Sequence, residues 1–137
     1  MLETTLSSLA GVPAFLAYFA LAILILLIFI RIYTWVTPHD ELALIRENNS
    51  AASLAFGGAL IGFSLPLSSA ITHSLSLLDC ALWGLIALIV QVLTFFVLRV
   101  ALKQLPERII QGEMAAGITS AAVAISVGFI NAASMSY

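Results

Sequence analysis

Charged side chains are scarce in this sequence. Only 9% of its 137 residues are Asp, Glu, Lys or Arg, whereas 62% are hydrophobic, and a soluble domain usually carries roughly a quarter charged residues. The chain therefore lacks the charged surface that a water-soluble domain of its size requires. Its single cysteine, Cys80, excludes an internal disulfide and any metal site built from several cysteines. A net charge of −2 without a basic patch gives no indication of nucleic-acid binding.

Sequence motifs typical of enzymes are also missing. There is no HExxH pair, no nucleophile elbow and no phosphate-binding glycine loop. No Asp or Glu lies inside a long apolar run, which argues against a proton-driven carrier of the usual kind. We therefore expect no enzymatic activity, no cofactor and no bound metal ion.

The chain contains instead four long uncharged runs. They cover residues 4–30, 48–78, 80–98 and 114–137, and each can supply the ~20 apolar residues that cross a membrane as a helix. We expect one all-α membrane domain, residues 1–137, with four transmembrane helices. The first run has no basic segment before it and no small-residue cleavage site after it. We therefore interpret it as a retained span and not as a secretion signal.

The basic residues indicate the orientation, because Lys and Arg near span ends favour the cytoplasmic side. All five lie at two of the connections between runs: Arg31, Arg46, Arg99, Lys103 and Arg108. We therefore predict that loops 37–48 and 103–113 are cytoplasmic in the inner (plasma) membrane of a bacterium. Both termini would then lie in the periplasm.

The first cytoplasmic turn gathers most of the chain's polar residues. We expect Thr37 to cap a short helix beginning at Pro38, with Asp40 and Glu41 facing water. His39, beside these acids, could bind a cation or relay a proton, although a solvated surface is the interpretation we favour. The residues that we single out in this turn are Thr37, Pro38, His39, Asp40, Glu41 and Asn49.

The two halves of the chain share a series of landmarks, although short matches in apolar helices also arise by chance. In each half an arginine is followed by a proline seven residues later and then by an alanine pair: Arg31, Pro38 and 51–52 in the first, Arg99, Pro106 and 115–116 in the second. We predict two-helix repeats covering residues 1–73 and 74–137. Each repeat crosses the membrane twice, so the two would have the same orientation.

Small residues recur along the second and fourth runs at the spacing of one helix face. They permit close approach of two helices in lipid, where dispersion forces and backbone proximity replace the hydrophobic effect. We expect these two helices to form the packed centre, either within one subunit or between subunits. The packing residues that we predict are Gly58, Gly62, Ala116, Ser120, Ala124, Gly128 and Ala132.

Four polar residues inside the runs have two interpretations. Ser64, Ser68, Gln91 and Asn131 could line an aqueous path or form another polar site. Alternatively, the serines bond back to their own helix and the amides hold helices together, which is the interpretation that we favour.

Two segments carry a family resemblance. TPHDELALIRENNSAASLAFGGALIGFSLPLSSAI and QGEMAAGITSAAVAISVGFINAASM resemble the YjfL-type family of bacterial inner-membrane proteins, a domain of unknown function. The resemblance implies a multi-pass protein made of two-helix repeats. It also implies a link to envelope stress, near ATP-grasp enzymes and PspA-like proteins, and it supplies no catalytic residue.

These observations lead to two functional hypotheses. In the first, the chain is a membrane scaffold that forms homo-oligomers through its small-residue helices and offers its cytoplasmic turns to a peripheral protein. In the second, it is a small ion channel or permeation pore, with Ser64, Ser68 and Asn131 near the lining.

Overall fold

The computed structural model describes residues 1–135, and residues 136–137, at the end of the second predicted repeat, lie outside that part. It contains α1 (Leu2–Leu9), α2 (Val12–Val36), α3 (Glu41–Arg46), α4 (Ser50–His73), α5 (Leu77–Ala101), α6 (Leu105–Ile110) and α7 (Met114–Ser134). No strand occurs among the described residues. Four helical segments are long and apolar enough to cross a membrane. These findings confirm the predicted all-α fold with four transmembrane helices.

The same order of elements occurs twice along the chain. A long helix, a six-residue helix and a second long helix appear first as α2, α3 and α4 and then as α5, α6 and α7. The residue before the N-cap has a positive φ in both halves, 66° at Asn48 and 78° at Gly112. The landmarks of the predicted repeat are placed differently in the two halves, since Pro38 precedes α3 whereas Pro106 lies in the first turn of α6, and the repeat stays a prediction.

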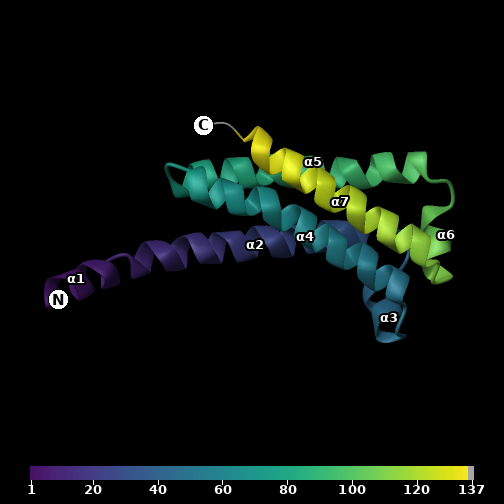
Figure 1. The fold of residues 1–137 in the computed structure, drawn as a ribbon, viewed down its shortest axis with the longest axis horizontal. Coiled ribbons are helices and arrows are strands. Elements are labelled where there is room, and N and C mark those ends of the chain that lie inside the picture. The colour runs from purple at the N-terminus through teal and green to yellow at the C-terminus, as the bar shows by residue number, and fades with distance from the viewer. Residues whose placement is uncertain (136–137) are drawn as a thin grey trace.

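Helices α4 and α7 lie side by side at the centre and run in the same direction (Figure 1). The residue numbers of the contacting pairs increase along both helices. Ala51 lies against Gly117 near the start, and the Ser69 hydroxyl donates to the carbonyl of Ala132 at 3.2 Å near the end. Helix α5 runs antiparallel to α7, since Ala87 pairs with Asn131. Helix α1 and the end of α7 lie toward one end of the bundle, and α3 and α6 lie at the other.

Glycines allow the close approach of α4 and α7. A Cβ atom on Gly58 would overlap Ala121, and one on Gly62 would overlap the backbone of Ala124. A Cβ on Gly128 would overlap the backbone of Gly62, whereas one on Gly57 would meet nothing within 4 Å. The α4–α7 contact is therefore a contact between backbones, the geometry that small residues make possible in lipid.

Aromatic rings attach α2 to this central pair. Phe29 stacks on Phe63 of α4 with ring centroids 4.5 Å apart. Tyr33 meets Phe95 of α5 edge to face at 5.5 Å, and such pairs contribute about 0.5–1.5 kcal/mol beyond the area they bury. The attachment involves only the second half of α2, because no residue from 1 to 21 is buried. Helix α1 and the start of α2 project from the bundle as an arm (Figure 1).

Candidate functional site

Two buried carboxamides connect α5 to α7. Gln91 Nε2 donates to the carbonyl of Ala124 at 3.3 Å, and Asn131 Nδ2 donates to the carbonyl of Ala87 at 3.3 Å. Both side chains are buried. A hydrogen bond between membrane helices contributes on the order of 1 kcal/mol, so the two amides help to hold α5 against α7.

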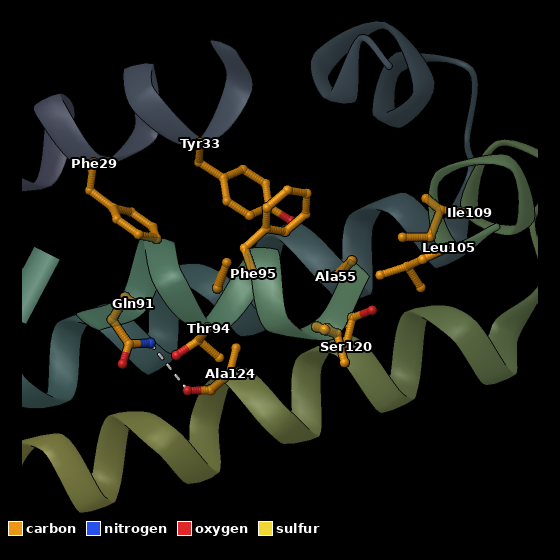
Figure 2. Close-up of a pocket in the computed structure, with 12 residues that line it drawn as sticks. Phe29, Tyr33, Ala55, Gln91, Thr94, Phe95, Leu105, Ile109, Ser120 and Ala124 are labelled. Carbon is orange, nitrogen blue, oxygen red and sulfur yellow. Dashed lines mark hydrogen bonds between the residues drawn. The ribbon is translucent and has the colours of Figure 1, made fainter. Parts of the chain in front are cut away.

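A small cavity lined in part by Gln91 lies between α2, α4, α5, α6 and α7 (Figure 2). Its volume is about 30 Å³, and its walls are mainly apolar. Four polar side chains contribute to its lining, those of Tyr33, Gln91, Thr94 and Ser120. Thr94 and Ser120 donate their hydroxyl protons to Val90 and Ala116 of their own helices. The space is too small for a hydrated ion but large enough for a water molecule.

The structure separates the four predicted polar residues into two groups. Ser64 and Ser68 are exposed on α4, away from the buried Gln91 and Asn131. They belong to a row along one helix face, which we call the outer α4 face: Ser50, Ser53, Gly57, Ile61, Ser64, Ser68 and Thr72, all small or hydroxyl-bearing except Ile61. The Ser64 hydroxyl donates to the carbonyl of Leu60 at 2.7 Å, and that of Thr72 donates to the carbonyl of Ser68 at 2.9 Å.

The turn between α2 and α4 differs from the solvated surface that we expected. The side chains of His39 and Glu41 are only 3% and 1% exposed, and His39 Nε2 lies 2.9 Å from Glu41 Oε1. Neither ring nitrogen and neither carboxylate oxygen meets hydrogen-bond geometry with a partner among the described residues. The short separation is therefore a close polar contact that does not meet hydrogen-bond geometry. The prediction that Glu41 faces water was wrong, because the turn folds back and packs α3 on α4.

The other residues of this turn cap helices. Helix α3 begins at Glu41 and not at Pro38, because the Asp40 carboxylate accepts the N–H of Ala43 and makes Asp40 the N-cap. Thr37 instead ends α2, and its hydroxyl donates to the carbonyl of Tyr33 at 3.0 Å. Asn49 caps α4, and its Nδ2 also donates to the carbonyl of Ile109 at 2.9 Å, linking α4 to α6. Asn49 thus ties the turn that holds α3 to the turn that holds α6.

The predicted packing residues of α7 lie on or beside its contact with α4. Ala116, Ser120 and Gly128 are buried, whereas Ala124 and Ala132 are partly buried. Sequence reasoning missed Gly117, which lies against Ala51. Gly117 is one residue away from Ala116 in the predicted row. A strict four-residue spacing does not follow the 3.6-residue turn of a helix, so the residues in contact shift by one position over several turns.

The described residues contain no group of three or more His, Cys, Asp or Glu side chains that could hold a metal ion. A catalytic constellation would need a nucleophile within hydrogen-bond reach of a base. Ser69 Oγ lies 3.4 Å from His73 Nδ1 and donates to the carbonyl of Ala132 at 3.2 Å, whereas the hydroxyl of Ser64 donates to its own helix. The arrangement consists of helix contacts, a small and mainly apolar cavity, the buried His39–Glu41 contact and the exposed Ser69–His73 contact.

Comparison with known proteins places this arrangement among membrane proteins without an assigned activity. Residues 7–135 match the family described as Domain of Unknown Function DUF350. The chain is 44% identical over 124 residues to the UPF0719 inner membrane protein YjfL of Escherichia coli K12, covering 90% of this chain and 94% of that protein. It is 24% identical over 119 residues to the UPF0719 transmembrane protein YshE of Bacillus subtilis 168, covering 85% and 89% of the two chains. No solved structure gives a significant match.

Proposed function

The chain belongs to the DUF350 family and is a multi-pass inner membrane protein, and from this premise we propose that it is an oligomeric membrane scaffold. The outer α4 face carries the proposal. Apart from Ile61, this face presents small or hydroxyl-bearing residues to the surroundings of the monomer, and Gly57 has open space in front of it. Lipid-facing helices usually carry bulky apolar side chains, whereas small faces in membranes are the ones that pack against another helix. A second copy of the chain is the partner that we propose for it.

The proposed scaffold offers its cytoplasmic turns to a peripheral protein. Asp40, Glu47 and Glu107 are exposed at the end of the bundle that carries α3 and α6. Because Asn49 joins the two turns, they present one composite surface. A link to envelope stress would fit a scaffold that recruits soluble proteins to the membrane, and it belongs to the proposal alone.

The proposed orientation places α3 and α6 in the cytoplasm and both termini in the periplasm. It rests on the basic residues, of which Arg31, Arg46 and Arg99 are exposed near helix ends. A phosphatase reporter that is active only in the periplasm, fused after the last residue, should therefore be active. A matching fusion within the α3 turn serves as the control and should be inactive. The opposite result for the two fusions would reverse the orientation.

A channel is the second candidate, and the hydroxyl groups of the outer α4 face favour it. A ring of subunits with this face inward would line a passage with Ser53, Ser64, Ser68 and Thr72. The lining would then come from between subunits, since the 30 Å³ cavity inside one subunit is too small for a hydrated ion. Buried Asn131 would not belong to that lining.

One cysteine variant distinguishes the two functions. On a Cys80→Ser background, Ser64→Cys should form disulfide-linked dimers in oxidised membranes if two copies of the outer α4 face are in contact, because Cα atoms must come within about 7 Å. A water-soluble thiol reagent should then leave this cysteine unlabelled. Leu85→Cys, exposed on α5, is the matched control and should not cross-link.

Other outcomes have definite meanings. Rapid labelling of Ser64→Cys without cross-linking, together with ion flux into sealed liposomes, would replace the scaffold by the channel. Equal cross-linking of the Ser64→Cys and Leu85→Cys variants would indicate random collisions and contradict an oligomer built through the outer α4 face.

A further inference from the structure

The first membrane segment is longer than a crossing requires. Leu2–Val36 contains 35 residues, and a helix of that length extends about 52 Å at 1.5 Å per residue. The hydrocarbon core of a bilayer is only about 30 Å thick. Helix α2 alone, with 25 residues, already extends about 37 Å. Helix α1 is therefore not needed for the crossing and lies where the span leaves the hydrocarbon, at the end of the bundle opposite α3 and α6 (Figure 1).

Helix α1 has one apolar face and one polar face. Leu2, Leu6 and Leu9 follow one another at spacings of four and three residues, which places them in one row along the helix. The polar face, on the other side of the helix, consists of Glu3, Thr4, Ser7 and Ser8. The three leucines are 72%, 58% and 58% exposed. The described part of the subunit thus leaves the leucine row uncovered.

The joint between α1 and α2 allows α1 to change direction. Residues 10 and 11 form a turn between the two helices. Pro13, in the first turn of α2, has no backbone N–H, so the carbonyl of Leu9 lacks the donor that would continue one helix into the other. Gly11, at the N-cap of α2, has no Cβ atom to restrict its backbone. The direction of α1 is therefore only weakly fixed by that of α2.

We propose that α1 lies along the membrane surface, with Leu2, Leu6 and Leu9 in the outermost hydrocarbon and the polar face toward water. A helix with one apolar and one polar face binds at the boundary between headgroups and acyl chains. The covalent link to α2 holds α1 at that boundary, and such tethering gives a high effective concentration. This is why a helix of eight residues suffices.

The contact with the membrane is apolar and not electrostatic. Residues 1–30 include no Lys or Arg, the residues that attract acidic lipids, and the charged side chain of α1 is the acidic Glu3. Depth in the bilayer should therefore be the same in neutral and acidic membranes. The inference is independent of the oligomer, because every residue in it belongs to α1 or to its joint with α2.

Spin labels on the full-length protein in lipid vesicles test the position of α1. On a Cys80→Ser background, a nitroxide is attached to Leu6→Cys or to the matched control Thr4→Cys, which lies about 200° away around the helix. Collisions with a water-soluble nickel chelate should be severalfold rarer at Leu6→Cys than at Thr4→Cys, and collisions with oxygen more frequent. Adding Leu2→Ser and Leu9→Ser removes the rest of the row and should raise the nickel collisions at Leu6→Cys to the level of the control.

Each other outcome overturns the proposal. Frequent nickel collisions at both labels would mean that α1 extends into water, whereas rare ones at both labels, with frequent oxygen collisions, would mean that it continues the span. A Leu6→Cys label shielded from both reagents would mean that protein covers the row, as a second copy of the chain would. A label depth that differs between phosphatidylcholine vesicles and vesicles containing phosphatidylglycerol would contradict an apolar contact. Because every residue of α1 is exposed, these variants leave the packing of the bundle intact.

Discussion

Gly58→Ala is expected to destabilise the subunit by about 3 kcal/mol, the upper end of the usual cost of overpacking. The added methyl group would overlap the Cα and Cβ atoms of Ala121, and a backbone atom cannot rotate away as a flexible side chain can. Helices α4 and α7 must then move apart along their whole contact. Gly58→Leu should go further and prevent assembly of the bundle. Unfolding by a denaturing detergent, followed by circular dichroism, measures the free-energy difference.

The neighbouring glycine supplies a matched control. Gly57→Ala changes the same residue type in the same helix, but its Cβ would meet nothing within 4 Å. It should leave stability unchanged or raise it by up to about 1 kcal/mol through the lower flexibility of alanine. Equal destabilisation by the Gly57→Ala and Gly58→Ala changes would mean that α4 and α7 do not meet at Gly58.

His39→Leu is expected to cost about 1–3 kcal/mol, because it removes the imidazole that lies 2.9 Å from the buried carboxyl group of Glu41. No other basic side chain makes an ion pair with Glu41 among the described residues. Replacing both partners, as His39→Leu with Glu41→Met, removes the two buried polar groups together. The double variant should therefore be more stable than the His39→Leu single variant. The same unfolding measurement on the wild type, the two single variants and the double variant completes the double-mutant cycle.

Asp40→Asn is the control for this turn. Asp40 is exposed and acts as an N-cap, a role in which asparagine is about as good, so stability should hardly change. Additive effects of the His39→Leu and Glu41→Met changes would rule out the coupling. A loss of stability in Asp40→Asn as large as in His39→Leu would show that the turn responds to any change of charge.

The membrane spans were predictable because they follow from composition alone. Residues 80–98, for example, include no charged residue. Within hydrocarbon, an α-helix is the only conformation in which a single segment satisfies its own backbone hydrogen bonds. The spacing of Gly58 and Gly62 also indicated a close helix contact. The spacing does not indicate which helix these glycines contact. In the structure both lie against α7 of the same subunit.

The environment of single polar residues was harder to predict. Ser64 and Gln91 are both uncharged polar residues inside apolar runs, yet one faces outward and the other faces the cavity. The rotation of each helix about its axis decides this, and that rotation depends on contacts made by all four helices. The short turn is harder still. A helix of six residues shows too little periodicity to reveal that Glu41 faces inward while Asp40, one position earlier, remains in solvent.

The shared direction of α4 and α7 has an electrical consequence. Each long helix carries a macrodipole of about half an elementary charge at either end, and α4 and α7 point one way across the membrane while α2 and α5 point the other. The four contributions oppose one another in pairs, and the buried amides of Gln91 and Asn131 carry no net charge. The membrane potential therefore exerts little net force on the membrane-spanning part of the bundle. What it can act on is confined to the ionised groups at the two ends.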